Sequence, residues 1–180
     1  MKVNTTKLQD CVTIEPVLFE DERGFFLETF QLKKYSNFIG GDLTFVQDNH
    51  SQSYMGCLRG LHFQRNKPQG KLVRVVGGSA LDVAVDLRRD SPTFGQWDSF
   101  VLSAENKKQA WIPPGFAHGF LATSEIVDFE YKCTDYYDAD DEGSIIWNDP
   151  DLKIEWPTGI NFIISGKDMT ASSFKSQFMQ

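Results

Sequence analysis

The chain has 180 residues, of which 41% are apolar and 24% charged, a profile typical of one soluble domain that buries its own core. Its 18 Lys and Arg against 25 Asp and Glu give a net charge of −7, which disfavours binding to nucleic acid and to anionic membranes. No apolar run is long enough to cross a bilayer, and the first residues lack the apolar core of a signal peptide. We therefore expect a cytoplasmic protein.

Alternation of apolar and polar residues dominates the chain, and helical periodicity is rare. Residues 71–76 and 81–87 are predicted to form two strands, and Gly77-Gly78 between them indicates a tight hairpin. In chain order, strands are expected at 13–20, 24–29, 44–49, 58–64, 71–76, 81–87, 100–103, 110–112, 119–123 and 126–134, with helices only at 31–38 and in a short piece after Asp168.

Short strands separated by Gly, Pro and Asn are typical of a closed antiparallel sandwich or barrel, and a jelly roll fits best. No repeat or linker divides the chain, so residues 1–180 are expected to form one all-β domain with short terminal extensions. Many strands leave sheet edges that must be covered, and pairing with a second copy is a common solution. A homodimer is the default expectation.

Three predicted strands carry polar side chains where a β domain normally places apolar ones. Alternation groups Tyr131 with the inward residues of 126–134, and Gln47 and Asn49 share one face of another strand. Residues 58–64 crowd Arg59, His62 and Gln64 onto one short strand. Inward polar groups are costly unless they are hydrogen-bonded or meet a ligand, so these strands indicate a binding site.

For each candidate residue, a purely structural role is the alternative to a functional one. Tyr131 alone fits a core tyrosine, and His62 alone is evenly balanced between structure and function. Asp168 in S-G-K-D fits a helix cap, Lys71 an edge-strand lysine, and Arg23 a surface ion pair in a turn.

A catalytic metal is not expected. Residues 113–118, P-P-G-F-A-H, have the form of the second cupin motif, but the first motif has H-F-Q where a metal site needs H-x-H. A three-histidine site would require all the histidines of the chain, His50, His62 and His118. The acidic stretch 138–143 is interpreted as a solvated loop, and Cys11, Cys57 and Cys133 as small buried residues with no disulfide framework.

Ordered blocks along nearly the whole chain resemble the dTDP-4-dehydrorhamnose 3,5-epimerase family, cupin-fold enzymes of dTDP-rhamnose synthesis. They include R-G-L-H-F-Q at 59–64, Q-D-N-H-S at 47–51, Q-G-K-L-V at 69–73, D-V-A-V-D-L-R at 82–88, I-P-P-G-F-A-H-G-F at 112–120, Y-K-C-T at 131–134 and S-G-K-D at 165–168.

The resemblance implies a metal-free, cofactor-free cupin jelly-roll homodimer that acts on dTDP-4-dehydro-6-deoxyglucose. In it, His62 is the base, Asp168 its partner and Tyr131 the acid, and Lys71 lies near the substrate carbonyl. It further implies a substrate site lined by Gln47, Asn49, Arg59, His118, Tyr137 and Lys167, with nucleotide contacts from Phe19, Arg23, Phe26 and Glu28 of the other subunit.

These roles suit the chemistry of a carbon next to a ketone. Proton removal there needs a base with a pKa near 7, which histidine provides, and a carboxylate behind it stabilises the imidazolium. Strict alternation, however, sets Arg59 and His62 on opposite faces, so we predict a bulge at Gly60. Three alternatives stay open: an epimerase that inverts one centre only, a metal-dependent cupin enzyme using the three histidines, and a sugar-nucleotide binding protein without turnover.

Overall fold

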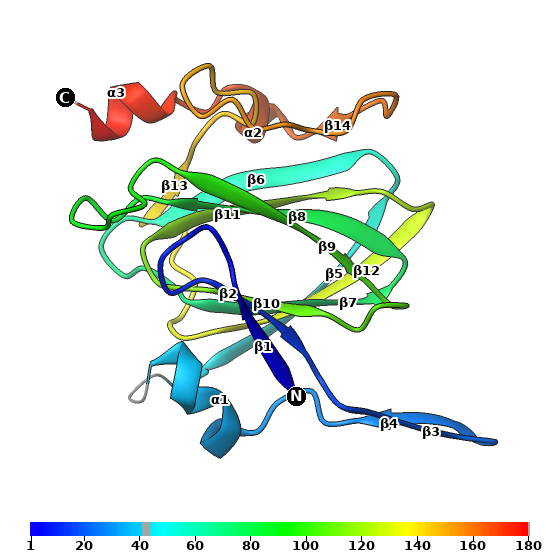
Figure 1. Ribbon diagram of the computed structural model, residues 1–180. Helices are drawn as coiled ribbons and strands as arrows, with labels where there is room; N and C mark the ends of the chain where they lie inside the picture. The colour runs from blue at the N-terminus through cyan, green and yellow to red at the C-terminus, as the bar shows by residue number, and fades with distance from the viewer. Residues whose placement is uncertain (41–43, 180) are drawn as a thin grey trace.

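The computed structural model describes residues 1–40 and 44–179, and these form two facing β-sheets (Figure 1). The first sheet contains, in spatial order, β1 (Lys2–Thr5), β2 (Val12–Glu15), β10 (Gln109–Ile112), β7 (Lys71–Gly77), β12 (Ile126–Cys133) and β5 (Gln47–Tyr54). The second sheet contains β13 (Glu142–Ser144), β6 (Cys57–Gln64), β11 (Phe116–Ala122), β8 (Ser79–Asp86) and β9 (Trp97–Ser103), with β14 (Ile163–Ile164) beside β6.

The main core lies between the two sheets. Val73 and Val75 of the first sheet and Ala84 of the second belong to one buried cluster. At its centre the rings of Phe120 and Phe129 stack with centroids 4.3 Å apart. Because successive residues of a strand point to opposite faces, the same alternation also turns the polar side chains of these strands toward this interior.

The outer faces of both sheets are covered in part by other segments of the chain (Figure 1). Helix α1 (Leu32–Ile39) packs Tyr35 and Ile39 against Trp111 of the first sheet. The second sheet is covered by β14, α2 (Gly166–Met169) and α3 (Phe174–Phe178), where Phe174 packs with Val83 and Val85. Strand β8 is therefore buried on both faces.

Strands β3 (Leu18–Asp21) and β4 (Gly24–Leu27) pair only with each other. They form a hairpin that projects away from the two sheets (Figure 1, lower right). The rings of Phe19, Phe25 and Phe26 are 61%, 55% and 68% exposed, which is unusual for large apolar side chains.

The predicted hairpin at Gly77-Gly78 is wrong, because β7 and β8 belong to different sheets. The two glycines carry the chain across from one sheet to the other, so that the strands face each other through the core instead of sharing hydrogen bonds. The residues of β7 pair with β10 and β12, whereas those of β8 pair with β9 and β11.

Several other strand boundaries differ from the predicted ones for local reasons. The expected strand 13–20 breaks into β2 and β3 at Pro16, which has no N–H to donate to a ladder. Strand β5 begins at Gln47 rather than 44, and Phe45 packs beside Trp111 instead of sharing a strand face with Gln47 and Asn49. Strands β1, β13 and β14 were not expected, whereas the helix at 31–38 is confirmed as α1. The helical piece expected after Asp168 is confirmed as α3, but α2, which carries Asp168 itself, was not expected.

The predicted bulge at Gly60 is confirmed. Opposite β11, three steps along β6 from Arg59 to His62 match two steps from Phe120 to His118. Gly60 has a φ of +122°, and a Cβ there would lie 2.7 Å from the Cα of Gly119. A glycine is therefore required at the point where β6 changes face.

No helix in the described residues is long and apolar enough to span a membrane.

Replacing Gly60 by Ala should lower the free energy of unfolding by about 1–3 kcal/mol more than Gly24→Ala does. Gly24 has nearly the same φ, +121°, but nothing lies within 4 Å of its virtual Cβ, so the pair separates the steric clash from backbone strain. Urea unfolding of both variants measures the difference. Equal losses would show that the packing of β6 against β11 adapts to the extra methyl group.

Candidate active site

Two adjoining pockets open on the inner side of the first sheet and share the side chains of His62, Lys71 and Tyr131. The larger, of about 510 Å³, lies between β6, β11 and the segment that carries α2. The smaller, of about 260 Å³, extends toward β5 and residues 137–142. Together they are large enough for a small-molecule ligand.

His62 and Asp168 form a hydrogen bond at the wall of the larger pocket, with Nε2 of the histidine 2.7 Å from Oδ1 of the carboxylate. An ionised carboxylate can only accept, so Nε2 donates and Nδ1 is left as the basic nitrogen. Burial raises the pKa of Asp168, but hydrogen bonds from His62, Gly60 and Ser165 outweigh it and hold that pKa below its usual range. The partner of His62 therefore stays ionised.

The position of Asp168 depends on the first turn of α2. Ser165 is the N-cap, and its hydroxyl accepts from the backbone N–H of Asp168, which donates at 3.1 Å. The expectation that Asp168 is itself the cap is wrong: it is the third residue of the helix and its side chain turns toward β6. The backbone N–H of Gly60 donates to its second oxygen at 3.3 Å.

The ammonium of Lys71 and the hydroxyl of Tyr131 both line the pockets, and neither has a hydrogen-bond or ion-pair partner within residues 1–40 and 44–179. Lys71 begins β7, an interior strand, so its interpretation as an edge lysine is wrong. Burial lowers the pKa of its ammonium group and raises the pKa of the Tyr131 hydroxyl. Tyr131 is thus a neutral O–H that can donate a proton.

A second histidine–carboxylate pair was missed by the sequence analysis. Nε2 of His118 lies 2.7 Å from Oδ2 of Asp82, and both side chains are buried. His118 faces His62 across the β6–β11 ladder and lines the larger pocket. Oδ1 of Asp82 is the one buried side-chain nitrogen or oxygen atom in the described residues that has no hydrogen-bond partner. In the sequence, the only sign of this pair was that Asp82 lies on the polar face of the predicted strand 81–87.

The remaining wall comes from several elements. Arg59 reaches the larger pocket and donates from Nε to the Ser53 hydroxyl at 3.0 Å. In the smaller pocket Gln47 donates to Asn49 at 3.0 Å, while its carbonyl oxygen accepts from the backbone N–H of Tyr137 at 2.9 Å.

Glu142 also belongs to this wall, although the sequence analysis placed it in a solvated loop. It accepts a hydrogen bond from the Tyr137 hydroxyl at 2.8 Å and forms an ion pair with Lys167, so it links β13 to α2. The neighbouring Asp141 is buried and accepts backbone N–H groups of Asn66 and Lys67. The stretch 138–143 is therefore part of the ordered site.

Four candidate residues lie outside the pockets of this chain: Phe19, Arg23, Phe26 and Glu28. The first three are on the projecting hairpin, where Arg23 pairs with Asp21 as a turn residue, with Nε 3.1 Å from Oδ2. Glu28 forms an ion pair with Lys34 of α1 at 2.7 Å. Within one copy of the chain these side chains therefore do not line either pocket.

The three histidines do not converge. His50 is exposed on the outer face of the first sheet, 3.2 Å from Asp128, whereas His62 and His118 point inward and each binds its own carboxylate. In the part of the chain that the structure describes, no group of three or more His, Cys, Asp and Glu side chains has the geometry to hold a metal ion. The donor set thus does not fit a three-histidine metal site.

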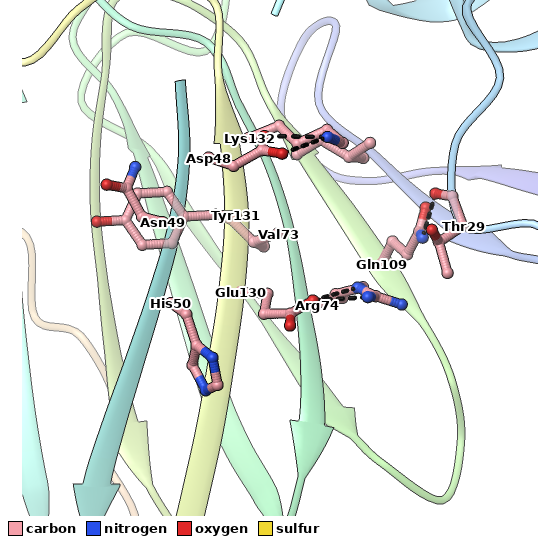
Figure 2. A pocket seen from close by; sticks show the side chains of 11 residues that line it. Thr29, Asp48, Asn49, His50, Val73, Arg74, Gln109, Glu130, Tyr131 and Lys132 are labelled. Atoms are coloured by element: carbon pink, nitrogen blue, oxygen red, sulfur yellow. Dashed lines mark hydrogen bonds and ion pairs between the residues drawn. The ribbon is translucent and has the colours of Figure 1, made fainter. Parts of the chain in front are cut away.

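Another cavity, of about 300 Å³, lies on the outer side of the first sheet. Figure 2 shows Tyr131 and Asn49 on one side of β12 and the outer charged side chains on the other. There Arg74 pairs with Glu130 at 2.6 Å and Lys132 with Asp48 at 2.8 Å. Two ion pairs satisfy the charged side chains of this outer cavity, whereas the inner pockets hold the Lys71 ammonium and the Tyr131 hydroxyl, which no described residue satisfies. The inner pockets are therefore the better candidate site.

The inner arrangement suits proton transfer at carbon. A histidine with a free Nδ1, a neutral tyrosine hydroxyl and an unpaired ammonium group share one cavity. They can remove a proton next to a carbonyl, stabilise the enolate oxygen and return a proton.

Asp168→Asn should lower the free energy of unfolding by about 1.5–3 kcal/mol at pH 7, because it removes the charged acceptor of His62. The pKa of Asp168 is depressed in the folded state, so this stability exists above the usual pKa of 3.8 and is lost as the pH falls through the folded value. Urea unfolding at pH 7 and pH 3 should show the difference from wild type shrinking at the lower pH. Asp90→Asn, on the surface, controls for the loss of one charge, and a pH-independent difference would contradict the linkage.

The chain is similar in sequence to known dTDP-4-dehydrorhamnose 3,5-epimerases. The family model described as dTDP-4-dehydrorhamnose 3,5-epimerase matches residues 5–176. A curated dTDP-4-dehydrorhamnose 3,5-epimerase of Salmonella typhimurium is 54% identical over 95% of this chain and 94% of its own. That of Pseudomonas aeruginosa is 51% identical over 97% of this chain and 96% of its own.

Solved structures of similar proteins include 3,5-epimerases and, at 30–33% identity, a 4-keto-6-deoxy sugar epimerase and a 3'-monoepimerase. A crystal structure of the 3,5-epimerase of Legionella pneumophila in complex with dTDP-4-keto-L-rhamnose is 52% identical, covering 96% of this chain and 92% of that one with a TM-score of 0.93. With most of its length matched at about half identity, the chain belongs to the dTDP-4-dehydrorhamnose 3,5-epimerase family of isomerases.

Proposed function

We propose that this protein inverts C3 and C5 of dTDP-4-dehydro-6-deoxyglucose and so forms dTDP-4-dehydrorhamnose in dTDP-rhamnose synthesis. One observation carries the proposal: the His62–Asp168 pair opens onto the same pocket as the unpartnered Tyr131 hydroxyl and Lys71 ammonium. The family's name and its ligand-bound relative supply the substrate class.

Each step has a residue of suitable chemistry. Nδ1 of His62 takes the proton from carbon, and the ionised Asp168 stabilises the resulting imidazolium. The electron pair left behind moves to the C4 oxygen, where Lys71 stabilises the negative charge. Tyr131 then donates its proton to the opposite face of the same carbon, which inverts the centre.

Both C3 and C5 flank the C4 ketone, so one base and one acid serve both centres if the sugar ring reorients between the steps. Nothing is oxidised or reduced. Between the two steps His62 releases its proton to water and Tyr131 takes one up from water, which restores the base and the acid. The reaction therefore requires no cofactor.

The rest of the pocket binds the sugar nucleotide. The diphosphate calls for arginine and lysine, and Arg59 and Lys167 line the larger pocket. His118 lies beside the sugar, and Gln47, Asn49 and Tyr137 close the smaller pocket.

The nucleotide site is completed by a second copy of the chain. Phe19, Arg23, Phe26 and Glu28 do not line the pockets of their own chain, but the projecting hairpin carries two exposed aromatic rings that suit a nucleobase. We assign the assembly as a homodimer of cupin-type jelly rolls, each formed by residues 1–180 as one domain.

Two alternatives are separated by measurement. An epimerase that inverts a single centre would keep the same four catalytic residues, and the fate of C3 and C5 distinguishes it. A binding protein without turnover would leave Tyr131 and Lys71 unused in a pocket where burial makes both costly.

Incubation of dTDP-4-dehydro-6-deoxyglucose with the protein in D₂O should replace the hydrogens at both C3 and C5 with deuterium and yield the rhamno product. Proton NMR follows both signals in one experiment. Exchange and inversion at one carbon alone would establish the single-centre enzyme, and no exchange by the folded protein would overturn the proposed function.

His62→Ala and Tyr131→Phe should each lower kcat about 10²- to 10⁴-fold while the fold is kept, because each removes a proton-transfer group. His50→Ala and Tyr54→Phe are the matched controls, since both side chains are exposed outside the pockets. Adding Asp168→Asn to His62→Ala should cause little further loss, because Asp168 acts through His62. Activity near wild type in either single variant would remove that residue from the mechanism.

A further inference from the structure

The projecting hairpin has two different faces. The register pairs Phe19 with Phe26, whose ring centroids lie 6.4 Å apart, and it pairs Glu20 with Phe25. Since directly paired residues of antiparallel strands lie on the same face and neighbours alternate, Phe25 lies opposite the Phe19–Phe26 face.

Phe25 is held from its own side by a lysine distant in sequence. Nζ of Lys107 lies 4.1 Å from the centroid of the Phe25 ring, a cation–π geometry. In the part of the chain that the structure describes, residues 18–27 make no hydrogen bond or ion pair outside the hairpin. The Lys107–Phe25 contact is thus the specific interaction between the hairpin and the body of its own chain.

Several hydrogen bonds fix the loop that carries Lys107, and the lysine itself has an uncommon backbone conformation. Its φ is +56°, in the left-handed region that a lysine rarely adopts. The loop holds it there: the Lys107 N–H donates to the Ser103 carbonyl at 3.0 Å, and Nζ donates to the carbonyl of Ala104. Oδ1 of Asn106 also accepts the N–H groups of Ser103 and Lys108, at 3.1 and 2.9 Å. These hydrogen bonds fix the loop and with it the place from which the Lys107 side chain reaches Phe25.

We propose that Lys107 is a positioning residue: it fixes the hairpin through Phe25 and so presents Phe19 and Phe26 to the nucleotide bound in the second copy of the chain. The inference rests on the proposed function, because the ligand and the second copy come from there. Lys107 contacts the Phe25 face of the hairpin, with Nζ 4.1 Å from the ring centroid, so the opposite face stays free for contact. Phe19 and Phe26, which lie on that opposite face, are exposed. Preorganising a binding element in this way lowers the entropy lost on binding.

The test compares Lys107→Gln with Lys107→Arg and with Lys108→Gln, a neighbouring lysine that pairs with Glu15 and does not touch the hairpin. Lys107→Gln should raise both the KM for the dTDP sugar and the Kd for dTDP about 2- to 5-fold, with kcat unchanged, because the catalytic residues are untouched. Lys107→Arg, which keeps the cation over the ring, and Lys108→Gln should behave like wild type.

A double-mutant cycle ties the effect to the ring. In a Phe25→Leu background, Lys107→Gln should raise KM and Kd no further, since the cation has lost its partner. A wild-type KM and Kd in Lys107→Gln, or equal effects with and without Phe25, would overturn the inference while the proposed function stands. Failure of the wild-type protein to bind dTDP would instead overturn the proposed function and the inference together.

Discussion

The hydrogen bond between His62 and Asp168 is the contact on which the candidate active site depends. It joins β6, within the second sheet, to a single helical turn more than one hundred residues later in the chain. On one side it needs the bulge at Gly60, which brings Arg59 and His62 to the same pocket. On the other it needs the Ser165 cap, which begins the turn that carries Asp168. Loss of either feature would leave the histidine without its orienting carboxylate.

Burial gives the pocket its reactivity. Burial disfavours the charged forms of both Lys71 and Tyr131. A nearby anion would therefore stabilise the Lys71 ammonium group, and the Tyr131 hydroxyl keeps its proton. Asp168 stays ionised in the same setting only because three hydrogen bonds converge on it. One pocket therefore holds a proton acceptor, a proton donor and an anion stabiliser without any of them neutralising another.

The contrast between the two sides of β12 separates the site from the surface. On the outer side, Glu130 and Lys132 are paired with charges on neighbouring strands (Figure 2). On the inner side, the Tyr131 hydroxyl has no hydrogen-bond partner among the described residues. The β3–β4 hairpin shows a similar contrast between its two faces: Lys107 contacts Phe25 on one face, and Phe19 and Phe26 on the other face are exposed. In both places the side that the proposed function uses is the side that the rest of the chain leaves open.

The sequence by itself determined the β class, most strands and the inward direction of Tyr131, because alternation with period two is a local property. It also predicted the bulge at Gly60, from the conflict between Arg59 and His62. The pairing of Asp168 with His62 was expected from the family resemblance and not from any local pattern. Only the tertiary structure decided which strands pair, as at Gly77-Gly78, and which carboxylate stands behind His118. Sheet partners and contacts over many tens of residues depend on packing between segments that no local pattern relates.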